Sequence, residues 1–344
     1  MKYKKLICLL FATSSVALAQ TSSYWDGQQT GEWGDASGWF ESDNSTPSTI
    51  PNGVDHVANF SNNSFYSGWG SISLEVYAED GGGSEIDGAD LDVTLGTWSQ
   101  TSVTSGRHID VRSEGTGGAA TMTFDVSSGN AAINHHANST SSGLTFQVVV
   151  QLNDNLVVTT TGNTIATGYR EGVTFNNAVS GAASITKNGA STLSFEGSSA
   201  NSFSGGLFVN DGLVQGMKDG AFGTGDIHVA ETSATSTATV EIADGVNDAI
   251  NDLASLYLVS FDDGSTNYST ITLAAGVNET IAALYFDGVL QSAGTWGATG
   301  SGADFINDNW FAGTGVLSVV PEPASFGVLL GALSLGFVAV RRRR

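Results

Sequence analysis

The chain has 344 residues with 34 Asp and Glu, 12 Lys and Arg, one cysteine and four prolines, and its formal net charge is −22. Seven of the basic residues lie near the two ends, at residues 2–5 and 341–344, so the body between them is more acidic still. Such a body should repel nucleic acid and anionic lipid, which excludes both as partners. Because Cys8 is the only cysteine and lies near the N-terminus, disulfides and thiol chemistry are excluded from the rest of the chain.

Residues 1–19 have the three parts of a Sec-type signal peptide. The first five residues carry three lysines, residues 6–11 are apolar, and Ala17-Leu18-Ala19 places small residues where a signal peptidase cuts. We therefore expect the Sec translocon as a partner and a mature chain that starts near Gln20. The apolar stretch is too short to favour a permanent N-terminal anchor.

The mature body has the composition of an all-β protein. It is rich in glycine (44 in the whole chain) and poor in proline, and short alternating apolar segments are separated by Gly, Asn, Asp and Ser. Disorder would suit the high Gly and Ser content, but every segment also contains β-branched or aromatic residues. About 300 residues can bury a core in one elongated or two globular units.

Residues 20–60 are rich in tryptophan and are expected to form an N-terminal cap. Trp25, Trp33 and Trp39 lie within 15 residues, with glycine and aspartate between them. Aromatic side chains can cover the open end of a β structure. Tryptophans next to acidic groups also suit stacking on sugar rings, and capping is the favoured of these two interpretations.

Residues 61–270 are expected to form a β-solenoid body. In its first part, residues 121–126 and 145–150 are the most convincing strands, and Asp154-Asn155 and Asn176-Asn177 are expected turns. The clearest pattern lies at 183–215, where short strands alternate with the turns Asn188-Gly189, Gly205-Gly206 and Asp211-Gly212. The expected strand residues are Ile185, Leu193, Phe195, Phe203, Leu207, Val209, Leu213 and Val214. Short strands with a glycine-bearing turn after each predict a coil of parallel strands.

This segment resembles the autotransporter-associated β-strand repeat over about 33 residues. Phe203 stands where that family has tyrosine, Ser191 replaces a glycine, and Leu207 replaces a threonine. The resemblance implies a right-handed parallel β-helix and no particular chemistry. Residues 271–318 look like the closing region of proteins in the same group. The repeat residues on which the resemblance rests are Lys187, Gly189, Thr192, Leu193, Phe195, Gly197, Asn201, Phe203, Gly205, Gly206, Val209 and Gly212.

Residues 319–344 form a tail with three parts in a fixed order. The triplet Pro321-Glu322-Pro323 is followed by an apolar run at 324–340 and by the basic cluster Arg341, Arg342, Arg343 and Arg344. The run of 17 residues would span about 26 Å as a helix, which is near the lower limit for crossing a bilayer. The arginines would stay cytoplasmic and leave everything before residue 324 outside.

The tail resembles the PEP-CTERM sorting signal of Gram-negative bacteria. The resemblance implies an inner-membrane precursor, an exosortase-type protease as a partner, and a cell-surface or extracellular destination. An ordinary tail anchor is the alternative. The glycines at 327, 331 and 336 suit a helix that packs against a partner or spans the membrane transiently.

No constellation in the sequence carries recognisable chemistry, so we expect no catalytic residue, metal or cofactor. His135-His136 are neighbours on an expected strand and would point to opposite faces. Asp262-Asp263-Gly264 and the group Asp87, Asp90 and Asp92 fit turns at least as well as calcium ligands. Arg170-Glu171 fits a surface ion pair as well as a catalytic pair. The remaining basic residues of the body lie scattered at 107, 112, 187 and 218.

The sequence therefore predicts an exported, non-catalytic surface or extracellular-matrix protein with a structural or adhesive role. An extracellular polysaccharide is the expected kind of ligand if it adheres to one. The alternative is a carbohydrate-active enzyme, a polysaccharide lyase or hydrolase, on the same scaffold. A groove with two or more convergent carboxylates would favour the enzyme. Exposed rows of Asn and Thr would favour the structural role.

Overall fold

The computed structural model shows an all-β protein, as predicted from the composition. It describes residues 21–25, 30–34, 36–43, 45–60, 72–75, 77–79, 85–90, 92–100, 109–113, 120–137, 143–162, 172–233, 236–261 and 267–320. Within these ranges the strands belong mainly to parallel sheets, and the one helical turn is the 3-10 helix η1 (Ala36–Gly38). No helix in the described ranges is long and apolar enough to cross a membrane. The expected helix at 324–340 lies outside them.

The largest sheet has twelve strands and is parallel except at its two ends. Antiparallel pairing is confined to β1 with β3 and to β27 with β28. In spatial order its strands are β28 (Val289–Leu290), β27 (Ala283–Phe286), β24 (Ser255–Val259), β22 (Ile227–Ala230), β20 (Leu207–Val209), β18 (Ile185–Asn188), β15 (Leu156–Gly162), β12 (Ala131–Ala137), β9 (Thr97–Gln100), β4 (Val57–Asn59), β1 (Ser22–Trp25) and β3 (Trp39–Phe40).

A ten-stranded sheet and a four-stranded side sheet accompany it, and both are parallel throughout. The ten strands are β2 (Thr30–Glu32), β5 (Ile72–Glu75), β10 (Ile109–Arg112), β13 (Gly143–Phe146), β16 (Gly172–Phe175), β19 (Thr192–Phe195), β21 (Leu213–Gly216), β23 (Thr239–Ile242), β25 (Thr270–Leu273) and β31 (Phe311–Gly313). The side sheet consists of β17 (Val179–Gly181), β14 (Val149–Leu152), β11 (Thr121–Phe124) and β8 (Val93–Leu95). A separate antiparallel pair joins β6 (Tyr77–Glu79) to β7 (Glu85–Asp90).

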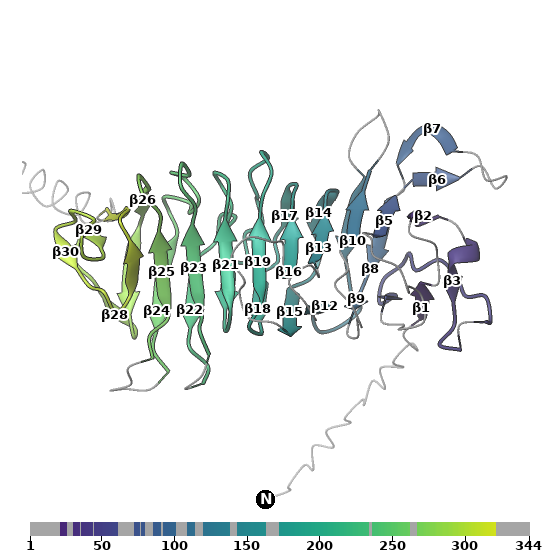
Figure 1. The fold of residues 1–344 in the computed structure, drawn as a ribbon, viewed down its shortest axis with the longest axis horizontal. Coiled ribbons are helices and arrows are strands. Elements are labelled where there is room, and N and C mark those ends of the chain that lie inside the picture. The colour runs from purple at the N-terminus through teal and green to yellow at the C-terminus, as the bar shows by residue number, and fades with distance from the viewer. Residues whose placement is uncertain are drawn as a thin grey trace, which may run out of the picture.

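The chain visits these sheets in a repeating order. Strands β11, β12 and β13 lie in the side, twelve-stranded and ten-stranded sheets, and β14, β15 and β16 follow in the same order. Each strand pairs in parallel with its equivalent in the next group, for example β12 with β15 and β13 with β16. Figure 1 shows the strands side by side across the long axis of an elongated body.

Two expectations about individual strands were wrong in detail. Residues 145–150 form no single strand, because the chain leaves the ten-stranded sheet at Phe146 and enters the side sheet at Val149. Gln147 lies at this corner, and its N–H donates to the carbonyl of Val111. Phe203 lies in no strand, although it is buried in the core.

The core of the body is built from rows of equivalent side chains in successive strands. Phe146, Phe175 and Phe195 occupy the same register position in β13, β16 and β19. Their rings stack with centroids 5.4 and 5.8 Å apart, and Phe203 continues the stack at 6.0 Å from Phe195. A parallel sheet repeats one side-chain position every ~4.8 Å, so identical rings meet face against face.

The tryptophans of the N-terminal segment lie in the interior. Trp25, Trp33 and Trp39 are at most 3% exposed, and Trp39 lies 5.0 Å from each of the other two rings. Trp33 lies 5.9 Å from Trp98 of β9, so the cluster joins the core of the body. These three rings therefore pack in the core, and none is exposed for stacking on a sugar ring.

A four-stranded sheet, named here the closing sheet, contains the last described strand. It consists of β26 (Asn278–Ile281), β32 (Val316–Val319), β29 (Gly294–Gly297) and β30 (Phe305–Ile306). Strand β32 is held between β26 and β29. The N–H of Val320 still donates to the carbonyl of Ile281, at 3.1 Å. Regular hydrogen bonding thus continues to the residue before Pro321.

Candidate functional site

Lys187, the first residue of the repeat motif, is a buried cation held by backbone carbonyls. Its Nζ donates to the carbonyl oxygens of Asn188 and Asp211, each at 3.1 Å, and to that of Gly189. Burial lowers the pKa of the amine from 10.5 to about 7, and the charge of Asp211 opposes part of that shift. The side chain ties the turn after β18 to the turn after β20, and it is fully covered.

Asn201 also links separate backbone segments, in this case through its side-chain amide. Its Oδ1 accepts the N–H of Val179 at 2.9 Å, and its Nδ2 donates to the carbonyl of Ala221 at 2.6 Å. Val179 and Ala221 lie about 20 residues before and after Asn201 in the chain, so one side chain joins three successive coils of backbone. Asn201 is 4% exposed and has no access to a ligand.

The glycines of the motif lie where backbone segments approach one another. A Cβ on Gly189 would stand 2.0 Å from the carbonyl oxygen of Thr160, and one on Gly205 would stand 2.4 Å from Ala183. The other motif residues are in the core or in turns: Thr192, Leu193 and Phe195 lie in β19, Phe203 in the core, and Gly197, Gly206 and Gly212 in turns with positive φ. The motif therefore builds the fold, and its residues do not converge on a reaction centre.

Glu279 of β26 is a fully buried carboxylate near the C-terminal end. Its two oxygens accept the backbone N–H groups of Ala249 and Ile250, at 3.0 and 3.3 Å. Burial raises the pKa of this carboxyl group from 4.5 to about 7, against the lowering effect of those hydrogen bonds. A carboxyl group with such a pKa suits general acid catalysis. Here both oxygens are occupied and covered, so its visible role is to hold the segment 249–250.

Glu231 is a second buried carboxylate with internal partners. It accepts the Ala238 N–H at 2.8 Å and the hydroxyl of Ser236, and Asn267 Nδ2 lies at 3.5 Å. Burial raises the pKa of Glu231. Neither Glu231 nor Glu279 was singled out from the sequence. Glu279 stands between Asn278 and Thr280, in a polar stretch that indicates an exposed position.

The histidine pair takes the two faces that the sequence analysis expected. His135 is buried and its Nδ1 lies 3.1 Å from Gln100 Oε1, whereas the half-buried His136 has its Nδ1 2.7 Å from Thr161 Oγ1. No group of three His, Cys, Asp or Glu side chains suited to a metal ion occurs among the residues whose positions are described. Asp92 accepts the N–H of Thr121 at 2.9 Å, which is a structural contact. Asp87 and Asp90 lie in β7.

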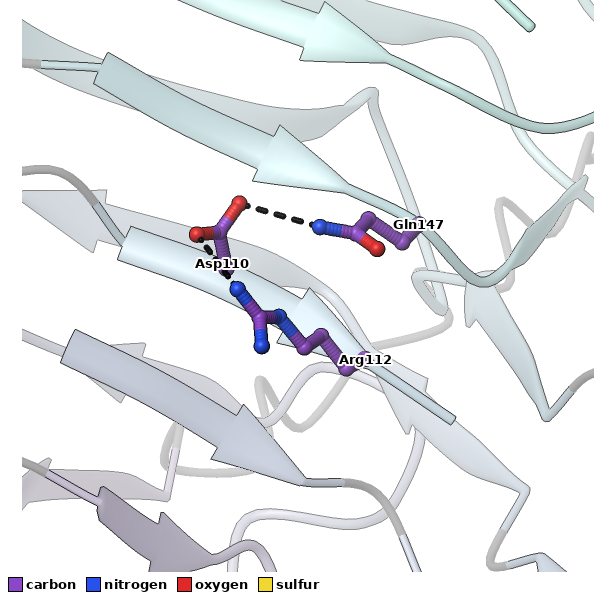
Figure 2. A network of polar contacts seen from close by, with 3 residues as sticks. All are labelled: Asp110, Arg112 and Gln147. Carbon is purple, nitrogen blue, oxygen red and sulfur yellow. Dashed lines mark hydrogen bonds and ion pairs between the residues drawn. The ribbon is translucent and has the colours of Figure 1, made fainter. Parts of the chain in front are cut away.

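The basic side chains that the structure describes bond to neighbouring groups of the protein itself. Arg112 Nη2 lies 3.2 Å from Asp110 Oδ2, and Gln147 Nε2 donates to the other oxygen of Asp110 at 3.2 Å (Figure 2). Lys218 donates to the carbonyl of Asn177 at 3.0 Å, and burial lowers its pKa from 10.5 to about 8. Several predicted residues lie outside the described ranges: Arg107, Arg170, Glu171, Asp262, Asp263, Gly264, and the whole sorting motif with Pro321, Glu322, Pro323, Arg341, Arg342, Arg343 and Arg344.

Sequence reasoning missed a half-buried aromatic row on the outer face of the twelve-stranded sheet. Phe208, His228, Tyr257 and Tyr285 occupy one register position in β20, β22, β24 and β27. Successive ring centroids are 4.9, 4.3 and 4.5 Å apart, with interplanar angles of 8° or less. The signal was present as an aromatic residue between two apolar ones in each strand, as in Leu256-Tyr257-Leu258.

Polar side chains also form contacts between successive coils, at the ends of β18 and β20 and, in the ten-stranded sheet, between β19, β21 and β23. Asn210 Nδ2 donates to Asn188 Oδ1 at 2.9 Å, and Gln215 bridges Ser194 and Glu241 at 3.2 Å on each side. No family model, curated protein or solved structure matches the chain. The arrangement thus offers repetitive outer surfaces, while Lys187, Lys218 and Glu279, whose pKa values are strongly shifted by burial, lie inside.

Proposed function

We propose that this is an exported, non-catalytic structural or adhesive protein of the cell surface or extracellular matrix, with a right-handed parallel β-helix as its body. The support for the β-helix is the recurring order of side, twelve-stranded and ten-stranded sheets, with in-register parallel pairing between successive groups. Coiled parallel strands of this kind form stiff bodies with repetitive faces. Stiffness and repetition suit a structural role.

The observation that best supports a non-catalytic role is that the ionisable side chains with shifted pKa values bond to the protein's own backbone. Lys187, Glu231 and Glu279 have shifted pKa values, yet each is buried and bound to the protein's own backbone. The outer faces carry the Asn188–Asn210 contact and the aromatic row instead. Ladders of this kind support stacking of one coil on the next.

The proposed route to the surface begins with the Sec signal at residues 1–19 and ends with the tail at 319–344. In the precursor the apolar run 324–340 spans the inner membrane with the arginines in the cytoplasm. An exosortase-type protease then recognises Pro321-Glu322-Pro323 and releases or re-anchors the body. Replacing the triplet by alanines should trap an unprocessed precursor in the inner membrane of a host that carries the protease. Normal maturation of that variant would make the tail a plain anchor.

A glycan screen tests the proposed role of the body. The purified mature chain, residues 20–318, is assayed for binding and for cleavage of a panel of extracellular polysaccharides. Binding without cleavage, or self-association alone, supports the proposal. Cleavage that disappears in Arg170→Ala or Glu171→Ala, with the fold preserved, would replace it by the carbohydrate-active enzyme.

A further inference from the structure

The hydrogen-bonded closing sheet reaches the residue before the predicted sorting motif. Val320 is still hydrogen-bonded to Ile281, and β32 is paired on both sides. No flexible spacer therefore separates the closing sheet from Pro321. A protease that binds the triplet must approach the closing sheet itself.

The end of the body near Val320, which a protease bound at the triplet must approach, carries exposed apolar side chains. Val289 and Leu290 of β28 are 63% and 60% exposed, Phe305 and Ile306 of β30 are 38% and 48% exposed, and Val320 is 45% exposed. We name these five residues the apolar rim. Figure 1 shows β28 and β30 at the same end of the molecule.

The closing sheet connects Phe305 of the apolar rim to the end of β32, where the chain leads to the sorting motif. Phe305 pairs with Trp296 and stacks on its ring at 4.6 Å, and Trp296 pairs in turn with Leu317 of β32. Phe305 also lies against Gly294, which is paired with Val319. The ring of Phe305 therefore packs on the buried ring of Trp296, and only β29 lies between its strand and β32.

Chain length limits how far this surface is from the membrane in the precursor. The predicted membrane segment starts at Ala324, four residue steps after Val320, and four steps reach at most about 14 Å. The two prolines restrict this connection further. While the tail is in the membrane, the apolar rim is held close to the bilayer and to any protease bound at the triplet.

We propose that the apolar rim is a docking surface for the membrane-embedded protease that processes the tail, an inference that rests on the sorting function proposed above. Charge favours a protein over the lipid surface as the partner. The sequence has no Lys or Arg between Lys218 and Arg341, and Asp287, Asp304 and Asp308 are exposed near the rim. Anionic lipid would repel this end. The matching protein surface is apolar and bordered by basic residues.

The test follows maturation of the full-length precursor in a host that carries the protease, by pulse-chase with precursor and mature forms separated by mass. The double variant Phe305→Ser/Ile306→Ser should mature roughly tenfold more slowly, as expected when an anchor of an interface is lost. Met217→Ser is the matched control, because Met217 is 45% exposed and lies directly after β21, away from the rim. Val289→Ser/Leu290→Ser provides a second rim variant on a separate strand, in case the first one lowers the melting temperature.

Three outcomes separate the two proposals. If both rim variants mature like the wild type while the alanine triplet variant is trapped, docking is wrong and sorting stands. Should the triplet variant mature normally, sorting fails and the docking proposal falls with it. A photo-cross-linking residue at position 306 should label an epitope-tagged protease, and labelling of lipid alone would overturn the choice of a protein partner.

Discussion

The imidazole ring of His228 and the phenol ring of Tyr257 lie face to face, with 4.3 Å between their centroids and 3° between their planes. They are register partners in β22 and β24, so the strand spacing itself sets their separation. Phe208 and Tyr285 extend the stack on either side. Because neighbouring rings occupy each other's faces, the row presents ring edges outwards. It is a stabilising ladder and an unsuitable platform for a sugar, which stacks on a free ring face.

Replacing an inner ring of this row should cost more stability than replacing an end ring. Tyr257 has aromatic neighbours on both sides and Phe208 on one, and an aromatic pair contributes about 1 kcal/mol beyond burial. We expect Tyr257→Leu to lower the free energy of unfolding by about 2 kcal/mol and Phe208→Leu by about half as much. Urea denaturation of the mature chain measures both. Equal losses would mean that the stacking contacts contribute nothing beyond buried area.

The short strands and the glycine-bearing turns could be predicted from the sequence because their signals are local. Gly189 and Gly212 were recognisable as turn residues, and both have positive φ in the structure. The corner at Gln147 was missed because apolar residues run through it without a glycine or proline. What decides that corner is pairing with Val111, 36 residues earlier in the chain, and local sequence carries no trace of that partner.

Two glycines with similar positive φ allow the cost of a steric clash between coils to be separated from the cost of backbone strain. Gly189 and Gly245 have φ of 78° and 80°, but a Cβ at Gly189 would meet the carbonyl of Thr160 at 2.0 Å and one at Gly245 would meet nothing within 4 Å. Gly189→Ala should therefore cost about 3 kcal/mol or more, and Gly245→Ala only about 1 kcal/mol. Thermal and urea unfolding of the pair measure the difference. Similar costs would show that β18 can move away from β15 freely.

Lys187 should make the protein more stable as the pH rises above 7. Its pKa is about 7 when folded and 10.5 in the reference state, so between these values the unfolded chain binds more protons. The free energy of unfolding then increases with pH through this window, by up to about 5 kcal/mol from this group. Lys218, with a folded pKa of about 8, adds in the same direction.

Lys187→Met should flatten that increase between pH 7 and pH 10, as measured by urea denaturation at several pH values. It also leaves the carbonyls of Asn188 and Asp211 without their donor, so the variant should be less stable at every pH in the window. Lys218→Met is the matched control and should remove the smaller share of the slope. An unchanged slope in Lys187→Met would show that the amine stays charged when buried.

The burial of carboxylates is the part of the candidate site that could not be predicted from the sequence. Glu279 stands in Asn278-Glu279-Thr280, a polar stretch that reads as exposed, yet it is fully buried. Its burial follows from the closing sheet, which brings residues 249–250 against β26 from about 30 residues away. Only the folded arrangement shows that a carboxylate must satisfy these two backbone N–H groups.

Glu279 should give the protein the opposite pH dependence in the acidic range. Its pKa rises from 4.5 to about 7 on folding, so between these values the folded chain binds more protons than the unfolded chain. The free energy of unfolding therefore falls as the pH rises from 4.5 to 7, by about 3 kcal/mol from this group, and the loss is complete above pH 7. Glu279→Gln should remove this slope, and because the amide resembles the protonated carboxyl group, the stability difference from the wild type should be smallest near pH 4.5. Glu241→Gln, on the outer face of β23, is the control and should keep the wild-type slope. Urea denaturation of the three proteins between pH 4.5 and 8 measures the effect, and a wild-type slope in Glu279→Gln would assign the proton uptake to other carboxylates.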